Sequence, residues 1–355
     1  MIADFSRVLV TGASGFIGSR LVQLLLSETA EPSQDGFEIL ALVRARSAPG
    51  SSSPNSYADQ AADNRPHLTF VTGDLTEPVT LNFDEKDSGA GLDSMIDVVY
   101  HLAAVTPESK ANGKMLRAVN LDGTKNLFHA VSDRAKHFVY ASGVAVFDPT
   151  TTTTTATASG DLSGSSNIVV INEETPKGSG MEYIKIRLEA EEFLRENCEK
   201  SGINLTVVYF PDIVYANSGS FRRIFLEQIS KGKFRIPGSG DYHVNFIHRE
   251  DAANILLAVA AKKNPSPKAE SFIASDSEPA PFREFVNYIA DQFGKKHPGS
   301  VPLFLAKAAV GSDLINMLTR NARASNEKIS KIYQLQYPSF RSGIPQVVSE
   351  FKAGR

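Results

Sequence analysis

The chain has 355 residues, a formal net charge of −3, and apolar and charged shares of 42% and 22% that are ordinary for a globular protein. This balance gives no reason to expect nucleic acid or a membrane as partner, and the single cysteine, Cys198, excludes an intramolecular disulfide and a cysteine-cluster metal site, so no metal is predicted. Because the first strand begins within about seven residues and no apolar run reaches the ~18 residues of a membrane span, we expect a cytoplasmic protein.

Strands and helices alternate through the first 210 residues. Short apolar runs predict strands at 7–10, 37–43, 68–71, 97–102, 137–141 and 205–210. Helical spacing of apolar residues predicts helices at 16–30, 119–131 and 183–200. This order favours an α/β fold, a Rossmann doubly wound parallel sheet with helices on both faces. Two segments rich in Ser, Pro or Thr, 46–66 and 149–166, are predicted to be long, flexible surface loops.

The pattern loosens after about residue 211. We therefore predict an NAD(P)-binding Rossmann domain over 1–210 and a smaller C-terminal α/β substrate-binding lobe over 211–355. Helices are predicted at 251–262, 282–293 and 322–333, and a strand at 271–274 that returns to the main sheet.

A glycine-rich turn follows the first predicted strand. Gly12, Gly15 and Gly18 stand in the sequence TGASGFIG, which begins at Thr11. A turn between a strand and a helix lets backbone N–H groups approach a pyrophosphate, and the helix N-terminus adds positive charge there. The glycine spacing alone is weak evidence, but a predicted strand before it and a predicted helix after it together predict dinucleotide binding.

The second predicted strand ends in Val-Arg-Ala-Arg, with Arg44 where an acidic residue would bind the ribose of NAD. An arginine at this point pairs instead with the 2′-phosphate of NADP. Arg44 therefore favours NADP(H) over NAD(H). A solvated arginine at the start of a loop is the alternative interpretation.

These motifs resemble the extended short-chain dehydrogenases/reductases, the NAD-dependent epimerase/dehydratase family, and in particular its dihydroflavonol-reductase-like branch. GDLT at 73–76, HLAA at 101–104, NLDGTKNL at 120–127 and FPDIVYA at 210–216 are similar to family segments. The resemblance implies that the cofactor is bound by the following residues: Thr11, Gly12, Ser14, Gly15, Phe16, Ile17, Gly18, Arg44, Asp74, Leu75, Leu102, Ala103, Ala104, Tyr183, Arg187 and Pro211. It places Thr106, Gly143 and Val144 beside the substrate.

The family's chemistry needs a Tyr, a Lys four residues later and a Ser or Thr at the end of the fifth strand. A phenol, with a pKa of ~10, is a poor base at neutral pH without a nearby cation. Here Tyr183 matches, but Arg187 stands at the Lys position and Gly143 at the Ser position. Lys185 points about 200° away around the helix from Tyr183. Tyr183, Arg187 and the neighbouring Ser142 are the candidate catalytic residues, and a leftover tyrosine in a cofactor pocket is the alternative.

The leading hypothesis is an NADP(H)-dependent oxidoreductase of specialised metabolism that acts on a small-molecule ketone or secondary alcohol. Tyr183 would exchange the proton, and Arg187 would hold the ribose and favour ionisation of Tyr183. Three alternatives stay open: a non-redox isomerase or dehydratase, a non-catalytic NADP-binding protein, and a nucleotide-sugar epimerase. Relatives often form dimers through helices that correspond to 121–132 and 183–200, so the sequence leaves a homodimer open.

Overall fold

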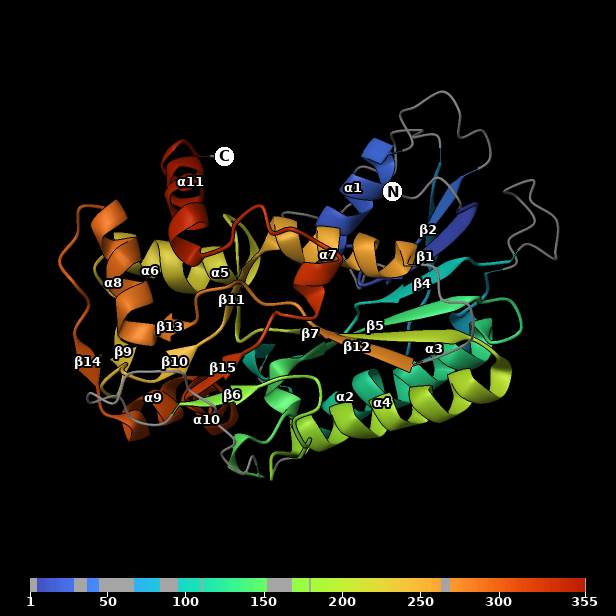
Figure 1. Cartoon of the computed structure of the whole chain (residues 1–355), viewed down its shortest axis with the longest axis horizontal. Coiled ribbons are helices and arrows are strands. Elements are labelled where there is room, and N and C mark those ends of the chain that lie inside the picture. The colour runs from blue at the N-terminus through green and yellow to red at the C-terminus, as the bar shows by residue number, and fades with distance from the viewer. Residues whose placement is uncertain are drawn as a thin grey trace, which may run out of the picture.

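A computed structural model describes residues 5–28, 37–44, 67–83, 95–109, 111–151, 168–178, 180–262 and 269–354. Within these ranges seven parallel strands form one sheet in the order β12-β7-β5-β4-β1-β2-β3 (Figure 1). The strands are β1 (Arg7–Thr11), β2 (Glu38–Val43), β3 (Leu68–Thr72), β4 (Val98–His101), β5 (His137–Gly143), β7 (Asn204–Phe210) and β12 (Ala269–Ile273). The predicted Rossmann-like α/β fold is confirmed.

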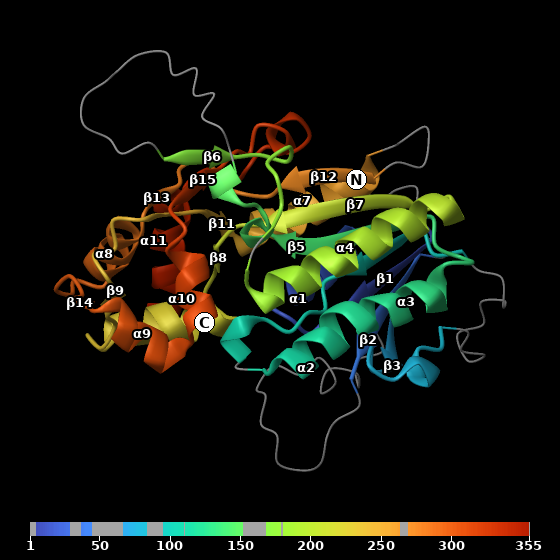
Figure 2. The same ribbon diagram turned by 90° about the horizontal axis from the view of Figure 1, so that it is seen from below.

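Apolar side chains on both faces of the strands explain why helices cover both sides of the sheet. On one face α1 (Gly18–Glu28) and α7 (Arg249–Ala261) pack against each other and on residues such as Val8, Val10 and Val139. The other face carries α2 (Gly113–Arg117), α3 (Gly123–Val131) and α4 (Glu182–Ser201), which lie side by side in Figure 2. A π-helical turn at Ala118–Asp122 joins α2 to α3.

The C-terminal half forms a further core, rich in phenylalanine, outside the sheet. Its helices are α5 (Gly219–Phe221), α6 (Glu227–Ser230), α8 (Phe282–Gln292), α9 (Leu303–Val310), α10 (Ser312–Leu318) and α11 (Phe340–Lys352). Short strand pairs connect the segments: β6 (Val169–Ile171) with β15 (Ala322–Ala324), β8 (Ile213–Tyr215) with β11 (Phe246–His248), β9 (Ile236–Pro237) with β14 (Ser300–Val301), and β10 (His243–Val244) with β13 (Ala280–Pro281).

The helix predicted at 322–333 is wrong. Residues 322–324 form β15 beside β6, and the side chain of Asn245 accepts from Ala324 N at 2.7 Å and donates to Ala322 O at 3.1 Å. These long-range bonds fix an extended backbone despite the helical propensity of the segment.

The predicted loop at 46–66 lies outside the described residues, as do residues 152–166 of the loop predicted at 149–166, whose first residues, Pro149–Thr151, form a 3-10 turn. Cys198 is buried in α4, and burial raises its pKa to about 12. None of the helices in the described part of the chain is long and apolar enough to cross a bilayer.

Candidate active site

The predicted site residues meet at one edge of the sheet. Because all strands of the sheet are parallel, their carboxyl ends lie together, and ligands of such sheets bind there. β1 ends at Thr11 and β4 at His101, and these neighbouring strands continue to β2 on one side and β5 on the other. This change of direction between β1 and β4 creates the crevice in which a dinucleotide is held.

The glycine turn after β1 has the shape of a phosphate cradle. Gly12 has a φ of 68°, and a Cβ added to it would lie 2.8 Å from Ala103 N. At Gly15 and Gly18 a Cβ would lie 2.9 and 2.1 Å from the carbonyl oxygen of Gly12. Ser14 and Gly15 are exposed, while Phe16 and Ile17 are half-buried. The turn therefore presents bare backbone at the start of α1, which fits a bound pyrophosphate.

Thr11 connects β1 to the next strand through its side chain. Its hydroxyl lies 2.8 Å from His101 Nδ1 and accepts from Ala103 N at 3.2 Å. The other ring nitrogen of His101 lies 2.9 Å from the hydroxyl of Thr124. Burial lowers the pKa of His101 to about 3, with a further contribution from the charge of Arg187. His101 is thus a neutral structural link that holds the segment Leu102–Ala104 beside the glycine turn.

Arg44 and Asp74 follow β2 and β3 at the far side of the crevice. Hydrogen bonds from the backbone and side chain of Thr76 lower the pKa of Asp74, and the charge of Arg44 adds to the effect. Arg44 is exposed. The neighbouring Leu75 is buried, and its carbonyl accepts from Asn126 Nδ2 at 2.8 Å. The structure therefore brings together the two side chains predicted for the adenosine end of the cofactor.

Tyr183 and Arg187 lie one turn apart on α4, on its buried side. Tyr183 is half-buried, whereas Arg187 is 3% exposed and Lys185 is exposed. The guanidinium of Arg187 lies over the ring of Tyr140, with Cζ 4.5 Å from the centroid, and donates to the carbonyl of Ala141. Both Tyr183 and Arg187 act electrostatically on Tyr140. Arg187 thus contacts β5, and its predicted contact with a ribose stays a prediction.

Ser142 and Gly143 end β5. Ser142 is buried, and its hydroxyl has no hydrogen-bond partner among the described residues. Alternation along the strand puts Ser142 on the same face as Tyr140, the face that α4 covers. A Cβ added at Gly143 would meet only the carbonyl oxygen of Phe210, at 3.8 Å. Position 143 therefore has room for the side chain that it lacks.

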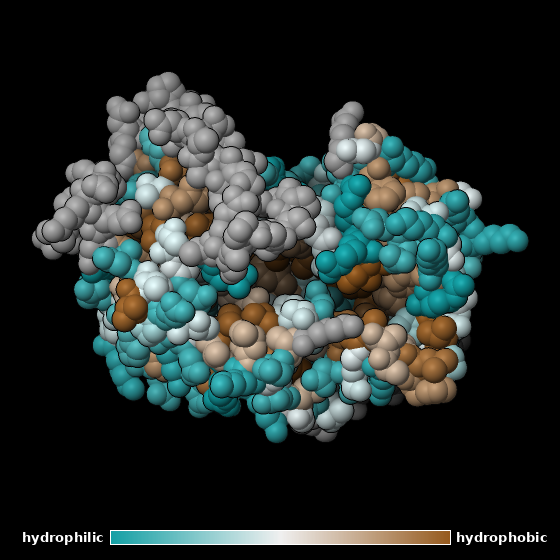
Figure 3. Space-filling view, turned by 180° about the vertical axis from the view of Figure 1, so that it is seen from behind, coloured by the Kyte–Doolittle hydropathy of each residue, from teal (hydrophilic) through white to brown (hydrophobic). Residues whose placement is uncertain are grey.

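Apolar side chains surround the candidate catalytic residues Tyr183 and Ser142 on the side of the C-terminal half. Val105, Met181, Tyr183 and Met317 are half-buried against the core beneath α4. Thr106 is half-buried, Val144 and Pro211 are buried, and Ala104 is exposed. Figure 3 shows a hollow with apolar walls between the sheet and the C-terminal half.

Arg320 is a residue of this region that sequence reasoning missed. It follows α10 and donates to the carbonyls of Val144, at 3.2 Å, and Phe147. Burial raises the pKa of the adjacent Asp212, although Asn245 donates to its carboxylate and the charge of Arg320 opposes the rise. Arg320 thereby ties the C-terminal half to the turn after β5. Nothing around Arg320 in the sequence signals this, because its partners are backbone carbonyls.

Two arginines and two histidines of the C-terminal half contact other parts of the protein. Arg222 lies over the ring of Phe351, while Arg223 is close enough to Glu108 to lower its pKa, against the larger effect of burial, which raises it. His243 donates its backbone N–H to Asn321, and His248 packs on Tyr337 with centroids 4.0 Å apart. Among the described residues, no group of His, Cys, Asp or Glu is arranged to hold a metal.

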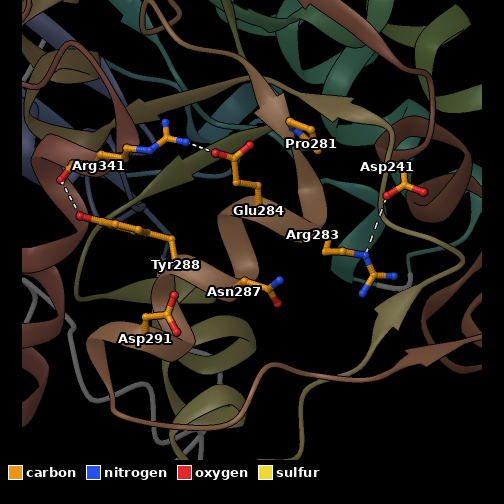
Figure 4. A pocket seen from close by; sticks show the side chains of 8 residues that line it. All are labelled: Asp241, Pro281, Arg283, Glu284, Asn287, Tyr288, Asp291 and Arg341. Atoms are coloured by element: carbon orange, nitrogen blue, oxygen red, sulfur yellow. Dashed lines mark hydrogen bonds and ion pairs between the residues drawn. The ribbon is translucent and has the colours of Figure 1, made fainter. Parts of the chain in front are cut away.

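A separate pocket of about 320 Å³ lies on the C-terminal half, beside α8 and the start of α11 (Figure 4). Its charges are paired: Arg341 with Glu284 and Arg283 with Asp241. It contains none of the residues that follow the strands of the sheet. The crevice, and not this pocket, is therefore the candidate active site.

Comparison with protein families supports the same interpretation. The model of the NAD-dependent epimerase/dehydratase family matches residues 8–274. The chain belongs to this family. The family and the chain's relatives comprise oxidoreductases, epimerases and dehydratases, which makes this protein a member of an enzyme family that uses a nicotinamide cofactor.

Two relatives illustrate the range of the family. A 3-beta-hydroxysteroid dehydrogenase of Mycolicibacterium neoaurum is 26% identical over 312 residues, which are 83% of this chain and 72% of that protein. A 4-hydroxy-2-methyl-3-oxo-4-farnesyl-3,4-dihydroquinoline-1-oxide ketoreductase of Stigmatella aurantiaca is 26% identical over 325 residues, covering 90% and 83% of the two chains.

Solved structures show the shared fold. A human epimerase family protein with NADPH superimposes with a TM-score of 0.70 at 18% identity, over 97% of this chain and 99% of that one. A dTDP-glucose 4,6-dehydratase of Streptomyces venezuelae with NAD gives 0.73 at 20% identity, over 98% of each chain.

Proposed function

We propose that this protein is an NADP(H)-dependent oxidoreductase that interconverts a small-molecule ketone and a secondary alcohol. The observation that carries the proposal is the position of Tyr183, half-buried in the first turn of α4 and close enough to Tyr140 of β5 to raise its pKa. Arg187 supplies a buried positive charge one turn away. The phenol of Tyr183 is thus available to a substrate at the carboxyl edge of the sheet, where the family's cofactor is bound.

The cofactor preference rests on the end of β2. The turn amides from Gly12 to Gly18 would hold the pyrophosphate, and Asp74 would lie beside the adenosine. Arg44 is exposed and lies near Asp74, where its guanidinium would pair with a 2′-phosphate. NADPH is therefore the proposed cofactor.

The proposed chemistry assigns a task to each side chain. When bound, a nicotinamide supplies a hydride to a carbonyl carbon or accepts one from an alcohol carbon. In reduction Tyr183 donates its phenolic proton to the carbonyl oxygen, and in oxidation it takes that proton back. The charge of Arg187 stabilises the negative charge left on the phenol oxygen. The unpartnered hydroxyl of Ser142 donates a second hydrogen bond to the substrate oxygen, in place of the side chain absent at Gly143.

The substrate is proposed to be largely apolar. Val105, Met181 and Met317 bound the space beside Tyr183, and charged side chains nearby, such as Arg320, are engaged with the protein's own backbone. A nucleotide diphosphate would need cations to bind its phosphates, whereas the described side chains named for this wall are apolar or, in Arg320, bonded to backbone carbonyls. The cytosolic location and the homodimer stay predictions.

Titration of the purified protein with NADPH and NADH, followed by nucleotide fluorescence, tests the cofactor assignment. We expect tighter binding of NADPH, and Arg44→Asp should remove the preference by abolishing the pairing with the 2′-phosphate. A panel of apolar ketones tests the reaction. Tyr183→Phe should bind NADPH as the wild type does and lose turnover by ~10²-fold or more. NADPH binding without oxidation on any ketone would overturn the oxidoreductase assignment.

One observation favours a second candidate, a non-redox enzyme or NADP-binding protein on the same fold. Arg187 is buried against Tyr140 and Ala141, and Gly143 offers no hydroxyl. The double variant Gly143→Ser, Arg187→Lys restores the family's groups at a position with room for the serine. Ketone reduction by this variant alone, absent from the wild type, would support the second candidate over the first.

A further inference from the structure

Asp212 is a carboxylic acid at the edge of the sheet that the proposed chemistry does not use. It follows Pro211, two residues after β7 ends at Phe210, and Phe210 is the register partner of Gly143 in β5. Because the two strands are parallel, Asp212 stands at the same edge of the sheet as Gly143 and Val144. These are two of the residues expected beside the substrate.

A hydrogen-bond network holds one oxygen of the Asp212 carboxylate in place. Oδ2 accepts from Asn245 N at 2.9 Å and from Asn245 Nδ2 at 2.7 Å. The side chain of Asn245 also donates to Ala322 O at 3.1 Å and accepts from Ala324 N at 2.7 Å. Asn245 is buried, so its side chain cannot turn away without leaving these groups unpaired. The direction of the carboxylate is therefore fixed before any ligand binds.

The second oxygen of the carboxylate, Oδ1, is left to accept from a ligand. In the described parts of the chain no other residue donates a hydrogen bond to it, and the side chain of Asp212 is only half-buried. Asp212 lines a small void together with Val144 and Met317, whose apolar side chains bound the substrate side of the crevice. An acceptor among apolar side chains gains from binding a hydrogen-bond donor, because its desolvation is otherwise uncompensated.

The charges around Asp212 favour a neutral donor. Arg320 lies near enough for its charge to act on the carboxyl group, while its guanidinium bonds to the carbonyls of Val144 and Phe147. Burial lowers the pKa of His243, which lines the same void, so this ring adds no charge at neutral pH. Arg320 would repel an ammonium group on the ligand, and Asp212 would repel an anion. A hydroxyl group carries no charge and donates to a carboxylate oxygen.

We propose that Asp212 determines substrate specificity by binding a hydroxyl group of the substrate through Oδ1, so that the substrate is a hydroxylated ketone or, in the reverse direction, the matching diol. This inference rests on the proposed function and adds one polar group to the apolar molecule proposed there. Tyr183 binds the oxygen that reacts, and Asp212 binds a hydroxyl that does not. Two fixed hydrogen-bonding points orient a ligand, and a site built to bind a hydroxyl discriminates against a ligand that lacks it.

Ligand NMR titrations of the full-length protein in the presence of NADP⁺ test the proposal. Cyclohexanone is compared with its three monohydroxylated forms. A ketone group cannot be reduced in this complex, so binding is measured apart from turnover. At least one hydroxylated form should bind about tenfold or more tightly than cyclohexanone. Asp212→Ala should remove this preference and change the affinity for cyclohexanone little.

A second variant and a control separate recognition from a structural effect. Asp212→Asn keeps an oxygen for Asn245 but presents an amide NH₂ in place of the second acceptor, so the preference should fall severalfold. Asp241→Asn is the matched control, since this carboxylate pairs with Arg283 at the separate pocket, and it should leave the preference unchanged. A purely structural role of Asp212 would weaken the binding of all the ketones equally.

Equal affinity of the wild type for cyclohexanone and all its hydroxylated forms would overturn the proposal. A preference that survives in both variants of Asp212, or an equal loss of affinity for every ketone, would do the same. The proposed function fails separately: a preference that depends on Asp212, without reduction of any ketone by NADPH, would leave the hydroxyl site standing and remove the oxidoreductase assignment. Reduction without the preference would give the converse.

Discussion

At the scale of single residues, a comparison of Gly12 with Gly202 measures the cost of placing a side chain against Ala103 at the glycine turn. Both have a left-handed backbone, with φ of 68° and 69°. A Cβ at Gly12 would meet Ala103 N at 2.8 Å, but at Gly202 it would meet nothing within 4 Å. Gly202→Ala should therefore lower the free energy of unfolding by about 1 kcal/mol, from backbone strain alone. Gly12→Ala should cost about 1–3 kcal/mol more and weaken NADPH binding. Urea unfolding measures both, and equal losses would contradict the close approach.

His101 makes the stability of the fold sensitive to acid. Burial holds its folded-state pKa at about 3, below the value near 6.5 of the unfolded chain. The unfolded chain therefore takes up a proton that the folded protein does not. The contribution of His101 to stability is complete above pH 6.5 and is lost as the pH falls towards 3, by about 1.4 kcal/mol per pH unit.

His101→Gln removes this titration and keeps groups that can bond to Thr11 and Thr124. The slope of the free energy of unfolding between pH 6.5 and about 4 should become shallower by roughly 1.4 kcal/mol per pH unit. Urea unfolding at several pH values measures it. An unchanged slope in His101→Gln would show that the ring is already charged in the fold.

The candidate catalytic residues show what can be predicted from the sequence at this scale. Helical spacing placed Tyr183 and Arg187 on one side of a helix and Lys185 on another, and the structure agrees. It did not reveal that Arg187 donates to Ala141, 46 residues earlier in the chain. Spacing fixes the direction in which a side chain leaves a helix, whereas its partner depends on which strand packs beneath it.

At the scale of elements, the strands of the sheet and the helices α7 and α8 were predicted from the sequence, whereas β15 and α11 were not. Strands buried on both faces are continuous apolar runs, such as VVYH in β4, and they are recognised without tertiary information. By contrast, α11 contains Gly343 and Pro345, which disfavour a helix. Gly343 is required because a Cβ there would lie 2.5 Å from the hydroxyl of Tyr215. Such a contact is made only after the C-terminal half has folded.

Arg320 joins two elements that are far apart in the chain, and its loss should be measurable. Arg320→Gln leaves the carbonyls of Val144 and Phe147 without their donor and Asp212 without its nearby cation. The free energy of unfolding should fall by about 2–4 kcal/mol, because buried acceptors are left unpaired. Arg341→Gln is the matched control: its ion pairs are with the half-exposed Glu278 and Glu284, so the loss should be at most about 1 kcal/mol. Similar losses would contradict the structural role of Arg320.

At the scale of the whole molecule, the sheet is completed by residues from beyond position 210. Residues from α7, such as Leu256 and Val259, bury the face of the sheet that carries Val139 and Val208. β12 then pairs with β7 and covers its open edge. The predicted domain boundary at residue 210 coincides with the end of β7. It nevertheless separates the first six strands of the sheet from α7, which covers one face, and from β12, which completes the edge.

A fragment of residues 1–210 should accordingly fail to fold on its own. It would expose the apolar face that α7 covers and leave unpaired the backbone groups on the edge of β7 that β12 covers, a combination that favours aggregation. We expect this fragment to bind a hydrophobic dye and to unfold without a cooperative transition, whereas the full chain unfolds cooperatively. A fragment of residues 1–274 keeps α7 and β12 and should regain a cooperative transition at a lower midpoint. Calorimetry of the three chains decides the point: if 1–210 unfolds cooperatively and binds no dye, the first half is a domain in its own right, and the packing of α7 on the sheet contributes little to its stability.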